Sequence, residues 1–213
     1  MSQSFLKSNP VDEKVRIGHV HLKVANIERA LGFYCDVLGF HITQRYGDSA
    51  VFISAGDYHH HIGLNTWESK GGPPPPPGST GLYHTAILYP TRAALADAIR
   101  RVKAAGIELD GAADHGVSEA VYLRDPDNNG VELYWDKARE LWPVDAGGLL
   151  KMYTKRLDLD NLLSEAPPHK ISQHMRLQAL SRWENEGGSL NEPDEASPNP
   201  EERSICNEYR QPD

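Results

Sequence analysis

Two stretches of this chain share one pattern, and this duplication limits the fold more than any other feature of the sequence. Each stretch begins with alternating apolar residues that predict a strand, and continues with apolar residues every three or four positions, which predict a helix. A glycine then follows, Gly39 in the first stretch and Gly106 in the second, as expected of a left-handed helix cap. Aligning His19 with His84 keeps the two patterns in register, which indicates an internal repeat.

Each stretch then offers further strands, so each unit has the order strand, helix and three strands. The additional strands are AVFISAG and HHHIGLNTW in the first unit, and AVYLRD and VELYW in the second. Two such units predict an α+β fold, in which paired βαβββ modules form a curved mixed sheet around a concave pocket with the helices outside. We expect the modules over residues 15–68 and 80–143. The linker between them, residues 69–79, contains five consecutive prolines, which cannot lie inside a sheet.

The two ends of the chain differ in composition from the modules. We expect residues 1–14 to form an N-terminal tail and residues 144–213 to form a polar, partly disordered C-terminal extension. The extension is rich in Glu, Asn, Ser and Pro, and such segments bury too little apolar surface to offset the entropy of ordering. Residues 147–166 could form one or two amphipathic turns, and residues 169–183 a short helix. We interpret His169 and His174 as solvated side chains.

Composition and charge exclude several classes of partner. The formal net charge is −8 and no long basic cluster is present, which argues against nucleic acid and against anionic membranes. No apolar run approaches the roughly 20 residues that span a bilayer, and the first residues lack the apolar core of an export signal. Cys35 and Cys206 are far apart in the sequence, so a structural disulfide is not expected. These features predict a cytoplasmic protein.

One carboxylate, Glu132, lies inside an apolar strand between Val131 and Leu133. A carboxylate in this position faces water, pairs with a cation or binds a metal. If the modules pair symmetrically, His19 and His84 approach the same pocket from matching strands, and Glu132 enters it from the last strand. Each of these residues alone is more simply a half-buried strand histidine or a solvated glutamate. Together they match the facial triad of two histidines and one carboxylate, which typically binds Fe(II).

Three motifs, in the same order, resemble the vicinal-oxygen-chelate superfamily, which includes glyoxalases, bleomycin-binding proteins and extradiol dioxygenases. They are GHVHLKV with FYCDVLGF, LYHTAILY, and DPDNNGVELY, and the resemblance covers residues 15–143. It implies that His19, His84 and Glu132 are the metal ligands.

Within the superfamily the chain most resembles catechol 2,3-dioxygenases. Tyr122 lies ten residues before Glu132, where extradiol enzymes have an active-site tyrosine, and His115 occupies the place of a histidine shortly before it. The segment YHHHIGL resembles the strand that carries the extradiol acid–base histidine, and its alignment gives that role to His60.

Strand alternation disagrees with that alignment. If Ile62 and Leu64 face the helices, His59 and His61 turn toward the pocket. A β-bulge before Ile62 would instead turn His60 inward. The sequence leaves both arrangements open.

The resemblance therefore implies an Fe(II)-dependent extradiol dioxygenase that cleaves catechol-like aromatic diols with O2, with Mn, Zn or Ni as alternative metals. His60, His115 and Tyr122 would be catalytic, and the expected substrate-binding residues are His61, Trp67 and Tyr134. The alternatives are another metal-dependent enzyme of this scaffold, such as an isomerase or thiol transferase, and a metal-free binding protein. Assembly into a homo-oligomer stays open.

Overall fold

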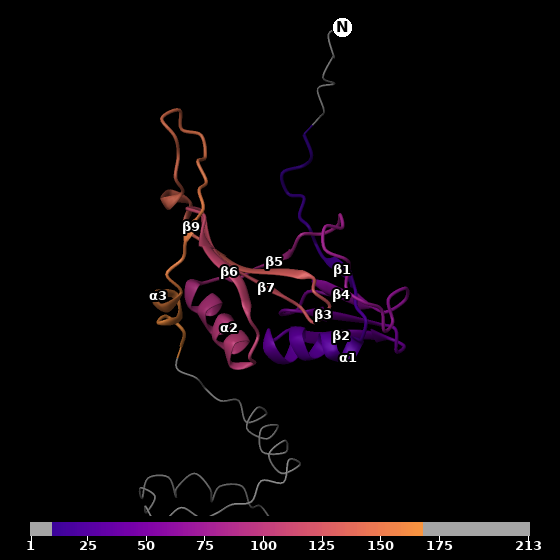
Figure 1. Cartoon of the computed structure of the whole chain (residues 1–213). Coiled ribbons are helices and arrows are strands. Elements are labelled where there is room, and N and C mark those ends of the chain that lie inside the picture. Colours follow the sequence, from indigo (N-terminus) through magenta and orange to yellow (C-terminus); the bar gives the residue numbers. More distant parts are fainter. Residues whose placement is uncertain (1–9, 168–213) are drawn as a thin grey trace, which may run out of the picture. The chain divides into compact units, whose positions relative to one another are not determined.

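The computed structural model describes residues 10–167 (Figure 1). The first module contains β1 (Val20–Lys23), α1 (Ile27–Leu31), the π-helical turn η1 (Gly32–Val37), β2 (His41–Tyr46), β3 (Ala50–Ser54) and β4 (Ile62–Asn65). The second contains β5 (Thr85–Leu88), α2 (Arg92–Ala104), β6 (Leu109–Asp114), β7 (Ser118–Arg124) and β8 (Gly130–Asp136). They are followed by the 3-10 turn η2 (Arg139–Leu141), β9 (Lys155–Arg156) and α3 (Leu159–Leu163).

The two modules repeat the same sheet topology. The first sheet has the order β1-β4-β3-β2, and the second has the order β5-β8-β7-β6-β9. In each sheet the first strand pairs in parallel with the last strand of its module, and the remaining neighbours are antiparallel. The α+β fold class and the duplicated βαβββ order are therefore confirmed. The modules form two hydrogen-bonded sheets instead of one continuous curved sheet, because no ladder joins β1 to β5 within the described residues.

The predicted helix signals have the expected conformations. Gly39 and Gly106 have φ angles of 90° and 70°, the left-handed values that end a helix at low cost only with glycine. Asn26 and Thr91 cap the N-termini of α1 and α2, and each accepts a hydrogen bond from the backbone three residues later. The apolar positions of both helices are buried in one hydrophobic cluster with the helix-facing residues of the strands.

Strand alternation separates the core from the opposite face of each sheet. In β8, Val131 and Leu133 are buried in the core, whereas Glu132 and Tyr134 alternate with them and are half-buried. In β7, Val121 and Leu123 are buried while Tyr122 is half-buried. The polar and aromatic side chains thus gather on the sheet face away from the helices.

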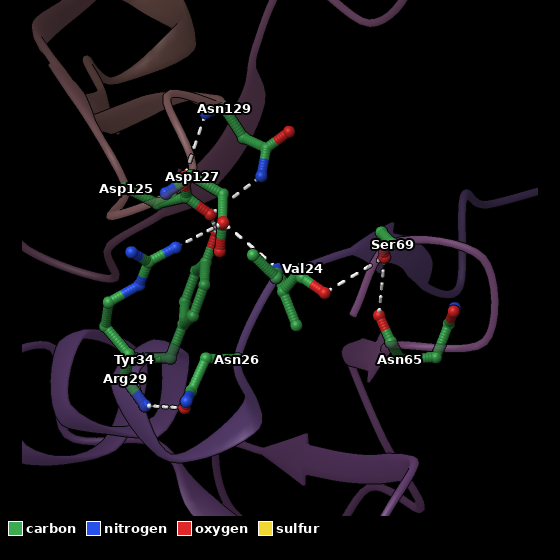
Figure 2. Close-up of polar contacts among 10 residues, drawn as sticks. Val24, Asn26, Arg29, Tyr34, Asn65, Ser69, Asp125, Asp127 and Asn129 are labelled. Atoms are coloured by element: carbon green, nitrogen blue, oxygen red, sulfur yellow. Dashed lines mark hydrogen bonds and ion pairs between the residues drawn. The ribbon is translucent and has the colours of Figure 1, made fainter. Parts of the chain in front are cut away.

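A polar joint connects the two modules on the helix side (Figure 2). The Tyr34 hydroxyl of η1 donates to Asp125 Oδ2 at 3.1 Å, and both side chains are buried. Asp127 Oδ1 accepts from the Ala25 backbone N–H at 3.0 Å and from Arg29 Nη2 at 2.5 Å. We call these five residues the inter-module joint.

The same Asp125 carboxylate closes the turn in which it lies. Its Oδ1 accepts from the backbone N–H of Asp127 at 2.9 Å and of Asn129 at 2.8 Å. Asn128 between them has a φ of 65°, a left-handed conformation that asparagine tolerates better than most residues. Because β8 begins at Gly130, directly after this turn, the joint also determines where the last strand of module two starts.

The first part of the expected extension is packed against module two. We call residues 143–167 the C-terminal strap. Its β9 pairs with β6, and Leu157 and Leu162 are buried in the core. Arg92 of α2 donates hydrogen bonds to Glu119 of β7 and to two residues of the strap, Asn161 and Glu165. The predicted helix over 169–183, with His169 and His174, lies outside the described residues.

Over residues 10–167, no helix has the length and apolar character needed to cross a bilayer.

Replacing Tyr34 with phenylalanine removes the buried hydrogen bond to Asp125 without removing the ring. We expect Tyr34→Phe to lower the free energy of unfolding by about 2 kcal/mol, because a bond to a buried carboxylate is lost. Urea denaturation measures the change. Tyr46→Phe, at an exposed position of β2, is the matched control and should leave the free energy within about 0.5 kcal/mol. Equal stabilities of Tyr34→Phe and wild type would contradict the role given to the joint.

The same pair predicts a dependence on alkaline pH. Burial, and then the neighbouring Asp125 carboxylate, raise the pKa of Tyr34 well above its usual value. The folded protein therefore holds this proton more tightly than the unfolded chain, so the contribution is complete below about pH 10. Above it, wild type should lose about 1.4 kcal/mol per pH unit relative to Tyr34→Phe. Urea titrations of both proteins at several alkaline pH values test this, and parallel curves would contradict it.

Candidate active site

His84 and Glu132 meet on the face of the second sheet that is opposite the helices. His84 Nε2 lies 2.9 Å from Glu132 Oε2, and the Glu132 side chain is 13% exposed. The pairing follows from topology, because His84 directly precedes β5, which runs parallel to β8. The other ring nitrogen, His84 Nδ1, is buried and has no hydrogen-bond partner among residues 10–167.

Tyr122 and His115 extend this pair into a hydrogen-bonded chain. Tyr122 lies opposite Glu132 in the β7–β8 ladder, and its hydroxyl donates to Glu132 Oε1 at 3.1 Å. His115 Nε2 lies 2.7 Å from the same hydroxyl. The structure therefore brings four of the predicted site residues into one polar chain, His84–Glu132–Tyr122–His115.

The Tyr122 phenol keeps its proton in this environment. Burial, and then the charge of Glu132 and the hydrogen bond to it, raise the pKa of Tyr122 to about 12. At neutral pH the phenol is therefore a hydrogen-bond donor beside a carboxylate, and not a phenolate.

A second group of predicted residues surrounds His19 in the first module. The rings of His19 and His60 have centroids 4.4 Å apart, and His60 also contacts Phe52 at 4.9 Å. His59 Nδ1 lies 2.7 Å from His60 Nδ1. Burial, followed by the neighbouring histidines, lowers the pKa of His60.

The structure also shows how the HHH segment is oriented. The β3–β4 ladder is regular and contains no bulge before Ile62, and β4 begins at that residue. His60 lies in the turn before the strand, where strand alternation does not apply, so its ring reaches His19 without a bulge. His61 bonds Ser54 Oγ through Nδ1 at 2.9 Å.

The expected substrate-binding residues come from both modules, His61 and Trp67 from the segments on either side of β4 and Tyr134 from β8. His61 is half-buried and lines a cavity of about 310 Å³ together with His19 and residues of β5. Trp67 is 59% exposed, and its ring lies 5.3 Å from that of His21. Tyr134 shares a sheet face with Glu132, two residues away on β8.

Some residues at these groups were missed by the sequence analysis. His21 contacts both Trp67 and Phe52, with ring centroids 5.3 and 5.9 Å apart, and its position two residues after His19 on the same strand face could have identified it. Tyr153 and Thr154 bond His115 from the strap. No pattern in the polar extension indicated that contact.

The two groups are not joined into one cluster of metal ligands. Among residues 10–167, no set of three His, Cys, Asp or Glu side chains is arranged to hold a metal ion. His84 and Glu132 supply an imidazole and a carboxylate at one point, which is a donor pair suited to a divalent metal. Because Nδ1 of His84 has no partner within the described residues, hydrogen bonds alone do not hold the orientation of this ring. A bound metal would supply a further contact. The participation of His19 stays a prediction.

The comparisons with known proteins identify the family of the chain. The family model described as the Glyoxalase/Bleomycin resistance protein/Dioxygenase superfamily matches residues 16–133, more than half of the chain. The chain belongs to this superfamily. A glyoxalase/dioxygenase structure from Nostoc punctiforme, 19% identical, covers 62% of this chain and 99% of its own with a TM-score of 0.50, which supports the superfamily fold.

Two curated proteins of this superfamily are more similar in sequence. The chain is 40% identical over 157 residues to a catechol-2,3-dioxygenase of Bacillus subtilis (strain 168), covering 73% of this chain and 54% of that protein. It is 35% identical over 121 residues to biphenyl-2,3-diol 1,2-dioxygenase 3 of Rhodococcus globerulus, covering 57% and 63%. The chain thus spans less than two thirds of the length of either relative.

In this superfamily member, a glycine keeps the His84–Glu132 pair together. A Cβ on Gly130 would lie 2.0 Å from the Tyr83 carbonyl oxygen, and 3.1 Å from the Cα of His84. Backbone contact at this distance cannot be relieved by a side-chain rotation, so any other residue must separate β5 from β8 beside the pair.

We therefore expect Gly130→Ala to destabilise the protein by about 2–3 kcal/mol and to weaken divalent-metal binding. Urea denaturation and titration with the metal measure the two effects. Gly111→Ala is the matched control, because a Cβ on Gly111 meets no atom within 4 Å. If both variants unfolded like wild type, close packing at Gly130 would not be required.

Proposed function

We propose that this chain is the catalytic unit of a metal-dependent extradiol dioxygenase, which opens the ring of catechol-like aromatic diols with O2. The observation that carries the proposal is the chain His84–Glu132–Tyr122–His115, which joins two metal-ligand types to a neutral phenol and an imidazole. The similarity to two aromatic-diol dioxygenases supports it.

In this proposal His19, His84 and Glu132 hold the metal, and Fe(II) is our choice, with Mn, Zn and Ni as alternatives. A facial triad leaves adjacent open positions, where a divalent metal would bind both diol oxygens and O2 and hold the two reactants in contact. The pairing of His84 with Glu132 supports two of the three ligands. His19 would be the third, from the matching strand of module one.

The proposed catalytic residues act on protons and on charge. His60, whose ring lies beside His19, would accept a proton from the bound diol and later return one. Tyr122 would donate its hydroxyl proton to the oxygen on which negative charge develops, in place of Glu132, and His115 would support it by donating to the phenol oxygen. The neighbouring carboxylate favours the neutral phenol, since burial and then Glu132 raise the pKa of Tyr122 to about 12.

His61, Trp67 and Tyr134 would contact the aromatic ring and exclude water. Trp67 lies beside His21, and Tyr134 shares the face of β8 with Glu132, so both would offer ring surface to an aromatic substrate. A cytoplasmic location belongs to the same hypothesis.

Two other functions use the same scaffold, an isomerase or thiol transferase and a metal-free binding protein. The Tyr122–His115 pair favours ring cleavage over both, because neither alternative needs a phenol and an imidazole bonded in series to the carboxylate.

The decisive experiment uses protein purified without oxygen and loaded with Fe(II), Mn(II), Zn(II) or Ni(II) in parallel. Given catechol or 2,3-dihydroxybiphenyl and then air, the Fe(II) protein should produce the yellow of a ring-opened semialdehyde. We expect Glu132→Gln and His84→Ala to lower the rate by about a hundredfold or more and to retain less metal. Glu140→Gln, an exposed carboxylate, is the control. Colourless reactions with Fe(II) and Mn(II), together with activity restored by Zn(II) or Ni(II) alone, would refute ring cleavage.

A mixing experiment tests whether the three ligands come from one chain. His19→Ala and Glu132→Gln should each be inactive, and a mixture of the two should remain inactive if both ligands belong to the same chain. Recovery of activity on mixing, up to about a quarter of wild type for random pairing, would instead assign the site to two copies of the chain.

A further inference from the structure

The C-terminal strap reaches the polar chain of the site at its outer end. His115 Nδ1 lies 3.1 Å from Thr154 Oγ1 and 3.3 Å from the Tyr153 carbonyl oxygen. The Tyr153 backbone N–H in turn donates to the His115 carbonyl at 3.2 Å. His115 is therefore held between Tyr122 on one ring nitrogen and the strap on the other.

The protons along this chain can be assigned by counting donors. Tyr122 has one hydroxyl proton and two neighbours, Glu132 Oε1 at 3.1 Å and His115 Nε2 at 2.7 Å. A hydrogen bond to a carboxylate is roughly twice as strong as one between neutral groups, so the proton belongs on the Glu132 side. The short contact at Nε2 is then favourable only if His115 donates its own N–H to the phenol oxygen.

A neutral imidazole carries one proton, so His115 with Nε2–H has a bare lone pair at Nδ1. That lone pair needs a donor. The Tyr153 carbonyl can only accept, whereas the Thr154 hydroxyl can donate. Of the two strap groups within hydrogen-bonding distance of Nδ1, Thr154 alone can complete the chain.

We propose that Thr154 is a positioning residue, whose hydroxyl holds His115 in the tautomer with the proton on Nε2. The chain then runs in one direction, from Thr154 through His115 and Tyr122 to Glu132. In this tautomer His115 presents an N–H toward the site. The link between this tautomer and catalysis rests on the proposed dioxygenase function.

The Tyr153 carbonyl oxygen, which also lies near His115 Nδ1, would favour the other tautomer of His115. Without the Thr154 hydroxyl, the favourable partner left for Nδ1 is the Tyr153 oxygen, which requires a proton on Nδ1. Nε2 then becomes an acceptor and competes with Glu132 for the Tyr122 proton. Loss of one hydroxyl on the strap would therefore exchange donor and acceptor in the His115–Tyr122 hydrogen bond and draw the Tyr122 proton away from Glu132.

The strap is anchored well enough to perform this role. After Thr154 it pairs with β6 through β9, and it buries Leu157 and Leu162 in the core. Arg92 ties it to α2 through Asn161 at 2.9 Å. Thr154 itself is exposed, so its replacement leaves these anchors in place and should not unfold the protein.

The test reads the tautomer directly, by ¹H–¹⁵N NMR of the full chain with labelled histidine. His115→Gln identifies the His115 signals, and a pH of about 8.5 keeps the ring neutral. Wild type should show the proton on Nε2. Thr154→Val, which keeps the side-chain shape, should move it to Nδ1, and Thr154→Ser should return it to Nε2. Thr80→Val, at an exposed position, is the control and should match wild type. A wild-type proton on Nδ1, or an unchanged tautomer in Thr154→Val, would overturn the proposal.

A kinetic arm tests the catalytic consequence. Thr154→Val should lower kcat about tenfold with KM within about twofold of wild type, and Thr154→Ser should recover most of the loss. A change of tautomer with unchanged kcat would reject the catalytic role. Absence of ring cleavage by wild type would count against the proposed function, while the NMR result would still decide the role of Thr154 in positioning His115.

Discussion

The arrangement of the site depends on the hydrogen bonds that the Asp125 carboxylate accepts. This carboxylate closes the turn from which β8 starts, and it accepts a hydrogen bond from the buried Tyr34 hydroxyl of module one. A single charged group therefore connects the helix layer of the first module to the strand that carries Glu132. Because a buried carboxylate is costly unless its oxygens are bonded, the turn, the joint and the strand position stabilise one another.

The proposed site draws on three parts of the chain. Module one contributes the histidines around His19 and His60, module two contributes the chain from His84 to His115, and the strap contributes Thr154. The groups differ in chemical character, since the first is aromatic and imidazole-rich whereas the second centres on a carboxylate. A metal held by residues of both modules would make their relative position, and hence the joint, part of the chemistry.

Local patterns predicted most of the fold correctly, for physical reasons that act over a few residues. Helix periodicity and the left-handed glycines at 39 and 106 identified both helices, and alternation along β8 separated Glu132 from the core. Alternation was less useful for His59, His60 and His61, because these residues precede β4 and lie in a turn. The polar composition of the extension concealed Leu157 and Leu162, two apolar anchors that are enough to hold the strap.

The sequence by itself determined the two modules and the sheet face that Glu132 occupies, since both follow from side-chain period and strand order. Tyr122 was predicted at the same site from the resemblance to extradiol dioxygenases. The tertiary structure alone decided three further features: the contact of His115 with Thr154, the ring contact of His60 with His19, and the joint through Asp125. Each of these three contacts joins residues that are far apart in the sequence or lie in a loop. Their separation in space depends on how whole elements pack in the core, which no local sequence pattern encodes.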